Sequence, residues 1–276
     1  MRRRDVLAAL CGTLASGQNA VLAQPLKPSV VGFLGLASAA SHSARTDAFR
    51  AGLRDLGYAE GKNILFESRW SEGHYDRLPA LAADLLRRNV DVIVTHAVPG
   101  ALAAKQATST IPIVIAAIGD ILDFDLISSL SRPGGNLTGL TFFNPELSAK
   151  RLELLKEALP DLSKAAVLLN STNPAKKAIL VAMERTATAL SIDLRIFEIA
   201  GPGEFEGAFA AMANQQIGAV VVHEDPMLNA NAQALARLGM SRRLPMAGFP
   251  ELASADGLLA YGIRFEEMDR RGDVRR

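Results

Sequence analysis

Several residues whose chemistry suits ligand binding come directly after the predicted strands of this chain. Asp120 and Asp225 are carboxylates that could each pair an ammonium group, while Asn170 offers both a donor and an acceptor. Backbone N–H groups at the start of the helices that follow could hold a carboxylate. Such a lining suits a zwitterionic or amide-bearing small molecule, although each residue could also be a helix cap with no other role. The residues in these positions are Ser38, Ser41, Thr95, His96, Asp120, Asn170, Thr172, Asn173 and Asp225.

Two other kinds of chemistry are open for the same loops. His42, His96 and His223 follow predicted strands and could converge on a metal ion, but their loose spacing favours polar loop residues lining a wet cleft. Asp225 with His223 could belong to a hydrolase, yet no serine or cysteine is placed by a motif as their nucleophile. The sequence contains no P-loop, no complete dinucleotide fingerprint, no Gly-x-Ser-x-Gly and no Cys-x-x-Cys. We therefore expect no catalytic residue, no cofactor and no metal.

Strands alternating with helices are predicted throughout the first half of the chain, which implies βαβ units, a parallel sheet and right-handed crossovers. After the fourth predicted strand, Leu122, Leu126, Ile127 and Leu130 lie at helical spacing and predict an amphipathic segment. The pattern then breaks at residues 132–136 (RPGGN), as expected where a chain leaves one compact unit for another. The predicted strands are 29–35, 64–69, 91–95, 111–117 and 137–143, and the predicted helices are 46–56, 75–88 and 101–107.

The same alternation starts again after residue 140, so the sequence predicts an α/β fold of two Rossmann-like lobes with parallel sheets joined by a hinge. Open sheets of this kind bind ligands at the carboxyl ends of their strands. We therefore interpret residues 115–141 as one wall of a cleft followed by the first hinge strand. The second array has predicted helices at 146–159, 176–190, 205–214 and 229–239, strands at 165–169, 193–199, 218–222 and 244–248, and a last short strand at 258–263 that could cross back.

Composition excludes some functions, and the N-terminus indicates a compartment. The 276 residues carry a formal net charge of +1 and no basic stripe interleaved with aromatics, so nucleic acid is not an expected partner. A single cysteine, Cys11, excludes an intrachain disulfide framework. Residues 1–23 have the pattern of a signal peptide, with three arginines, a short apolar run and small residues before Gln24. We expect export to the periplasm by the Sec or the twin-arginine route.

Seven segments between residues 48 and 263 are together typical of one protein family. The two most specific are QATSTIPIVIAAIGD at 106–120 and SLSRPGGNLTGLT at 129–141. The others are AFRAGLRDLGYAEGKNI (48–64), NVDVIVT (89–95), ELSAKRLELLKEALP (146–160), LLNSTNP (168–174) and GLLAYGI (257–263). On these segments the chain resembles the ABC-transporter substrate-binding proteins with a type I periplasmic-binding fold, in the group associated with aromatic amino acids such as tryptophan and tyrosine.

The resemblance implies two lobes, joined by three hinge crossings, that close on a small molecule and deliver it to an ABC permease at the inner membrane. The ligand is then an amino acid or a related amide or zwitterion, and the protein is expected to be a monomer. The rival functions are a two-lobed hydrolase and a ligand-sensing module for a receptor partner. The ligand-contacting positions that the resemblance implies are the 38–42 loop with Ser38, Ser41 and His42, the 95–97 loop with Thr95 and His96, Asp120, Asn170, Thr172, Asn173, Asp225, and Tyr261 at the returning hinge.

The chain departs from the family's pattern at two places. After Asp120 the family usually carries proline and small residues, whereas this chain has Ile121-Leu122-Asp123, which would reshape the rim of the cleft. Family members continue for several dozen residues past the Tyr-Gly hinge and complete the first lobe, whereas this chain ends in a polar tail. We therefore expect a truncation or frame shift near Asp269 and an incomplete first lobe. The expected organisation is a signal peptide at 1–23, lobe 1 at 28–140, lobe 2 at 141–260, and a hinge return with a truncated tail at 261–276.

Overall fold

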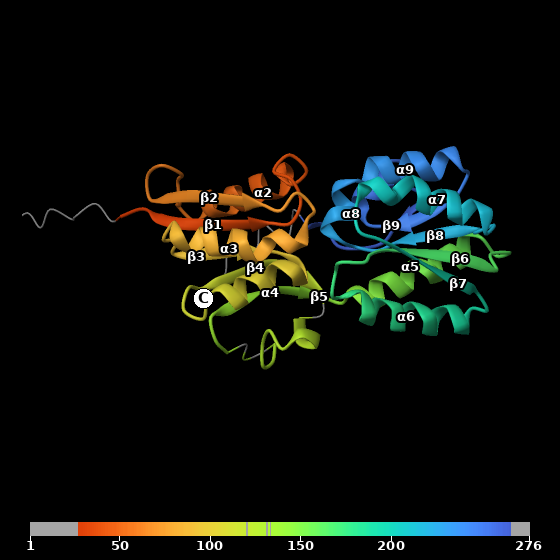
Figure 1. Ribbon diagram of the computed structural model, residues 1–276, viewed down its shortest axis with the longest axis horizontal. Coiled ribbons are helices and arrows are strands. Elements are labelled where there is room, and N and C mark those ends of the chain that lie inside the picture. Colours follow the sequence, from red (N-terminus) through yellow and green to blue (C-terminus); the bar gives the residue numbers. More distant parts are fainter. Residues whose placement is uncertain (1–26, 120, 131, 133, 266–276) are drawn as a thin grey trace, which may run out of the picture.

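The computed structural model of the protein describes residues 27–119, 121–130, 132 and 134–265. The predicted signal peptide, Asp120 and the predicted tail after residue 265 lie outside these residues. Two sheets of parallel strands lie one after the other along the long axis of the molecule (Figure 1). The predicted α/β fold of two Rossmann-like lobes is therefore confirmed. No helix in the described part of the chain is long and apolar enough to cross a membrane.

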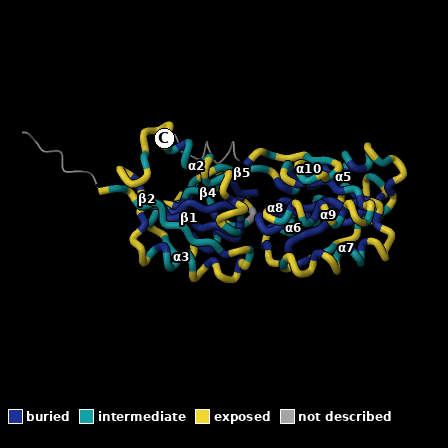
Figure 2. Tube along the Cα trace, turned by 90° about the horizontal axis from the view of Figure 1, so that it is seen from above, coloured by how far each residue is buried: buried dark blue, intermediate teal, exposed yellow. Residues whose placement is uncertain are grey.

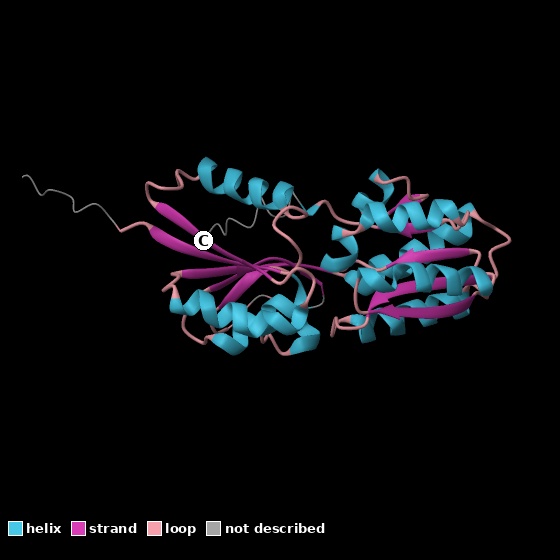
Figure 3. Cartoon of the chain, turned by 45° about the horizontal axis from the view of Figure 1, so that its top comes forward, coloured by secondary structure: helices cyan, strands magenta, loops and turns pink. Residues whose placement is uncertain are grey.

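The first lobe has the strand order β2-β1-β3-β4-β5. Its elements are β1 (Ser29–Gly35), α2 (Ser43–Asp55), β2 (Ile64–Trp70), η1 (Tyr75–Arg77), α3 (Leu78–Arg87), β3 (Val92–Thr95), α4 (Ala97–Ala107), β4 (Ile113–Gly119), η2 (Ile121–Phe124) and β5 (Leu137–Phe142). Figure 3 shows α2 on one side of the sheet and α3 and α4 on the other. Side chains of β1 alternate between these faces, because Val31 and Phe33 pack with Phe49 of α2 while Leu34 packs in the larger cluster with Leu85 of α3. Because a strand that is buried on both faces is apolar throughout, the sequence alone predicts β1 correctly.

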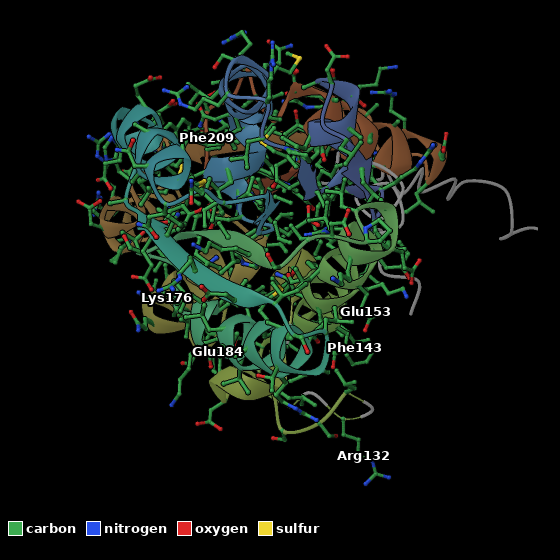
Figure 4. The ribbon with its side chains drawn as sticks, turned by 90° about the vertical axis from the view of Figure 1, so that its right-hand side faces the viewer. Arg132, Phe143, Glu153, Lys176, Glu184 and Phe209 are labelled. Carbon is green, nitrogen blue, oxygen red and sulfur yellow. The ribbon has the colours of Figure 1, made fainter. Side chains whose placement is uncertain are left out.

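The second lobe has the strand order β10-β9-β8-β6-β7. Its elements are α5 (Asn144–Ala158), β6 (Lys164–Asn170), α6 (Lys176–Ala189), β7 (Asp193–Ile199), η3 (Pro202–Glu204), α7 (Phe205–Asn214), β8 (Ala219–Val222), α8 (Pro226–Ala230), α9 (Ala232–Ser241), β9 (Met246–Gly248), α10 (Pro250–Ser254) and β10 (Leu259–Ala260). Leu168 of β6 packs with Phe209 of α7, whereas Leu169 packs with Ile179 of α6 on the opposite face. Figure 4 shows Phe209 on one side of this sheet and Lys176 on the other. The inner strands of the two sheets form the buried centre of both lobes (Figure 2).

The prediction of an amphipathic helical segment after β4 is wrong. Only the short 3-10 turn η2 forms, and Asp125, with a φ of 51°, directly follows it. A residue in the left-handed region cannot continue a right-handed helix. Leu126 is buried in the core, whereas Leu122 and Leu130 are 49% and 50% exposed. Their spacing therefore marks no common buried face.

Two predicted elements near the C-terminal end also differ from the structure. The helix predicted at 229–239 is two helices, α8 and α9. The strand predicted at 258–263 is only β10, which pairs with β9 and so extends the second sheet. The chain approaches the first lobe beyond β10, where the ring of Phe265 lies 5.7 Å from that of Phe142.

Gly139 allows β5 to pack closely against β4. Its φ is 153°, and a Cβ atom built at this position would lie 2.2 Å from the backbone oxygen of Ile115. The β4–β5 register also shifts between Ile115 and Ile118. The last strand of the first sheet, from which the chain passes to α5, therefore depends on a residue without a side chain.

Replacing Gly139 by alanine should lower the free energy of unfolding by about 1–3 kcal/mol, the usual cost of forcing atoms into a filled site. The measurement is urea denaturation followed by circular dichroism. Gly207→Ala in α7 is the matched control, because no described atom outside its chain neighbours and its own helix backbone lies within 4 Å of a Cβ built there, and alanine favours a helix. Equal stability of G139A and G207A would contradict this role of Gly139.

Candidate functional site

A cleft between the two lobes is lined by loops that follow strands of both sheets. Its walls come from the starts of α2, α4, α5 and α6, from the loop after β8, and from Phe265. The empty volume of this cleft, including the open space at its mouth, is about 450 Å³. The polar side chains that line it are Arg45, His96, Asn144, Asn173, Glu224, Asp225 and Asn229, and the apolar ones are Ala97, Val98, Ala117, Phe142, Ala175, Pro226 and Phe265.

Three polar groups of this lining are buried without a hydrogen-bond partner in the described protein: Arg45 Nη2, Asn144 Oδ1 and Asn229 Oδ1. Arg45 Nη2 lies 3.5 Å from Glu251 Oε1, an ion pair that lacks hydrogen-bond geometry. Buried polar groups are nearly always paired in folded proteins. One donor and two acceptors in the same cleft therefore mark where the polar groups of a small molecule would bind.

An aromatic ring holds the guanidinium of Arg45 in place at the cleft. Its Cζ atom lies 3.9 Å from the centre of the Phe265 ring, which in turn meets Phe142 edge-on. Stacking of this kind orients an arginine without using its N–H groups. The same two rings form an apolar part of the cleft wall.

Glu224 is fixed on the cleft wall by a buried ion pair with Arg151 of α5. Arg151 Nη2 donates to Glu224 Oε2 at 2.7 Å, and the two side chains are 0% and 3% exposed. Asn229 Nδ2 donates to the other oxygen at 3.0 Å, and Arg151 Nε donates to the backbone oxygen of Tyr261 at 2.7 Å. Burial raises the pKa of Glu224 above its usual value, and the charge of Arg151 opposes that rise. Arg151 thus links α5, the returning chain and the cleft.

Asp225, one residue further, is surrounded by neutral donors. Asn170 Nδ2 and Asn173 Nδ2 donate to its two oxygens at 3.1 and 2.8 Å, and the backbone N–H of Met227 donates at 2.9 Å. Tyr75 of the first lobe adds its hydroxyl at 3.1 Å from each oxygen. Asp225 therefore caps α8 and joins the lobes, and burial raises its pKa.

His42 and His96 form a buried pair with their Nε2 atoms 3.0 Å apart. One ring must donate and the other accept, so at least one of the two is neutral. Burial lowers the pKa of His42 to about 3 and that of His96 well below its usual value, and Arg45 adds to both shifts. His223 is also fully buried, with its pKa lowered to about 3 by burial, but it does not line the cleft. Among the described residues, no group of three His, Cys, Asp or Glu side chains is placed to hold a metal ion.

The structure places the predicted site residues in different roles. His96, Asn173 and Asp225 line the cleft, and His42 forms a hydrogen bond with His96 without lining the cleft itself. Asp120 lies outside the described residues. The remaining predicted residues are absent from the described lining. Ser38 and Ser41 border a neighbouring cavity between the lobes, and Tyr261 is 44% exposed. The hydroxyl of Thr95 donates a hydrogen bond to the backbone oxygen of Leu34, and the hydroxyl of Thr172 donates one to Asn170 Oδ1.

The residues missed from the sequence lie mostly within helices. Arg45 and Asn229 belong to α2 and α8, where nothing local distinguishes them from surface residues, whereas Asn144 starts α5 directly after the predicted strand 137–143 and so had a local signal. Arg151 could have been found. Ser148 and Arg151 share one helical stripe with the core residues Leu152 and Leu155, and polar residues on the apolar face of a helix indicate a buried polar contact.

Two sheets of parallel strands that meet at a cleft, with polar groups from both lobes that lack a hydrogen-bond partner among the described residues, fit the two-lobed fold of solute-binding proteins. The chain belongs to the ABC transporter substrate binding protein family, whose model matches residues 31–272. It is 26% identical over 222 residues to the tyrosine-binding protein of Clostridioides difficile strain R20291, which covers 80% of this chain. The chain spans less than two thirds, 63%, of the length of that curated relative.

Solved structures share the fold at lower identity. A crystal structure of an ABC domain in complex with L-Trp from Streptococcus pneumoniae has a TM-score of 0.79 and 22% identity, with 88% of this chain and 82% of that chain covered. A conserved domain protein from Vibrio cholerae has a TM-score of 0.82 and 23% identity, with 89% and 82% covered. The expected family and fold are therefore confirmed.

Removing the guanidinium in Arg151→Met should lower the free energy of unfolding by about 3–5 kcal/mol, because Glu224 is left buried without its partner. The folded-state pKa of Glu224 then rises further above its unfolded value. The deficit should shrink as the pH falls and Glu224 takes up a proton. Denaturant titrations at pH 7.5 and pH 5 measure both effects.

The neighbouring variant Lys150→Met is the control, since the ion pairs of Lys150 with Glu153 and Glu157 are at the surface. K150M should unfold like the unmodified protein at both pH values. An R151M variant as stable as K150M would show that the buried pair does not hold the second lobe together.

Proposed function

We propose that this protein is an exported solute-binding protein that captures an amino acid, or a related zwitterion or amide, between its lobes for an ABC importer. The observation that carries the proposal is the set of buried groups in one cleft that have no hydrogen-bond partner among the described residues: the donor Arg45 Nη2 and the acceptors Asn144 Oδ1 and Asn229 Oδ1. Arg45 belongs to the first lobe, and the two asparagines follow the first hinge crossing or lie in the second lobe. A ligand that pairs with all three favours the closed form over the open one.

The chemistry of these groups supports a zwitterion. Arg45 is suited to a carboxylate, and the two amide oxygens, with Glu224 beside Asn229, are suited to an ammonium group. The rings of Phe142 and Phe265, with Val98, would contact an apolar side chain of the ligand. The tyrosine-binding protein and the L-Trp complex among the similar proteins support the same ligand class.

The cellular role follows from the family and the N-terminal sequence. Delivery to an ABC permease at the inner membrane, action as a monomer, and export by the signal peptide at 1–23 belong to this proposal. In this role the protein carries out no chemistry, so the purified chain should return its ligand unchanged.

A thermal-shift screen of the purified chain against the twenty amino acids and their amides tests the proposal. Binding to the native state alone stabilises it by about 2.7 kcal/mol at a ligand concentration of 100 Kd. At least one amino acid should raise the melting temperature, and its des-amino and amide analogues should bind more weakly. If no amino acid or amide shifts the melt, the proposed ligand class is wrong.

Arg45→Gln should raise the Kd of the amino acid found in that screen by about 10- to 100-fold, the usual cost of a lost charge-assisted hydrogen bond. Isothermal titration calorimetry measures this change. Glu251→Gln is the matched control, since it removes the ion pair of Arg45 but leaves the guanidinium in the cleft. An equal loss of affinity in R45Q and E251Q would contradict a direct contact between Arg45 and the ligand.

A further inference from the structure

Tyr75 is a buried tyrosine of the first lobe whose hydroxyl is bonded to the second lobe. It begins η1, after β2, and is 8% exposed. Its hydroxyl lies 3.1 Å from each carboxylate oxygen of Asp225 and accepts the backbone N–H of Met227 at 3.3 Å. Burial and the facing carboxylate raise the pKa of Tyr75 well above its usual value. The hydroxyl therefore stays protonated and donates a hydrogen bond to Asp225.

The surrounding residues also join the two lobes. Ala175, just before α6 of the second lobe, is packed into the main apolar cluster of the first lobe. A Cβ atom built at Gly73 would lie 3.5 Å from Met227 Cγ, so these two residues face each other closely. Tyr75, Gly73 and Met227 are absent from the lining of the cleft. The contact between the lobes therefore extends beyond the surface that a ligand would touch.

Asp225 is held ready for this contact by its own lobe. Asn170, Asn173 and the N–H of Met227 orient its oxygens, and none of them carries a positive charge. A buried carboxylate without a cation depends on the number of its donors. Tyr75 is the donor to Asp225 that comes from the first lobe, and it is therefore the one that separation of the lobes would remove.

We propose that Tyr75 is a positioning residue whose hydrogen bond to Asp225 forms only when the lobes are together, so that it sets the closed fraction of the protein. The inference rests on the proposed function, in which a ligand is held between the lobes. The chain leaves the first sheet at Phe143 and comes back toward it at Phe265. Figure 1 places α8, which Asp225 caps, beside the first lobe and away from the β5–α5 connection. Opening about that connection separates Tyr75 from Asp225.

Loss of this hydrogen bond should affect all ligands equally. A hydrogen bond to a charged group changes an equilibrium by about tenfold or more. The apparent Kd of a ligand that needs the closed form rises as the closed fraction falls, by the same factor for every such ligand. Direct binding of a ligand by Asp225 would instead give a factor that differs between ligands.

The test is Tyr75→Phe, which keeps the buried ring and removes only the hydroxyl. Tyr58→Phe is the matched control, because Tyr58 is 43% exposed on the same lobe. Spin labels at cysteines introduced for Asp47 in α2 and Arg237 in α9, both exposed, report the distance between the lobes in a Cys11→Ser chain. Titration calorimetry of the amino acids that bind reports the affinities.

In Y75F the closed-to-open ratio should fall about tenfold, and every Kd should rise by one common factor, while Y58F matches the unmodified protein. A distance distribution and affinities like those of Y58F would overturn the proposal, and so would a loss of affinity that differs between ligands. If no amino acid binds even the unmodified protein, the proposed function fails, and the distance measurement alone still decides the role of Tyr75.

Discussion

The buried ion pair between Arg151 and Glu224 is the interaction on which the hinge and the cleft both depend. Arg151 lies in α5, the first helix after the chain leaves the first sheet, and holds the Tyr261 carbonyl where the chain comes back. Its other contact holds Glu224 on the cleft wall. Because a buried charge is costly without its partner, the helix, the returning chain and the wall are fixed relative to one another. The second lobe thus presents a preformed surface to a ligand.

Two adjacent carboxylates in this wall are separated in role by the partners they have. Glu224 is paired with the guanidinium of Arg151 and the amide of Asn229, and it lines the cleft. Among the described residues Asp225 is paired with neutral donors, one of which comes from the other lobe. The sequence shows two acids in a row after a strand, and only the tertiary structure assigns one to the cleft wall and the other to the contact between the lobes.

Most of the fold could be predicted from the sequence, because strands buried on both faces are apolar throughout and helices show one apolar stripe. β1, which is buried along most of its length, coincides with its predicted range, and so does β7, although β7 is an edge strand with several exposed residues. The helical segment predicted after β4 was wrong, because that prediction rests on the spacing of the leucines alone. Asp125 takes a conformation that ends a helical turn. No periodicity reveals the φ of a single residue.

The cleft could be predicted only in part, for a related reason. The rule that ligands bind at the carboxyl ends of strands found the loops, and with them His96, Asn173 and Asp225. It could not find Arg45 or Asn229, since these side chains reach the cleft from within helices, and it missed Asn144 although this residue directly follows the predicted strand 137–143. Which helix start points into a cleft is set by how two lobes close, and that depends on contacts between residues far apart in the chain.

The balance of charge in the cleft argues for a ligand without net charge. Arg45 is the cation among the described lining residues, and burial keeps the neighbouring imidazole pair neutral, so no second positive charge adds to it. Glu224 is already neutralised by Arg151, and the carboxylate of Asp225 in the same lining offsets the charge of Arg45. When the lobes close and water leaves, an unbalanced charge on the ligand would be desolvated without full compensation. The ammonium and the carboxylate of the proposed ligand would meet the amide oxygens and Arg45 together, so that closure would leave neither end unpaired.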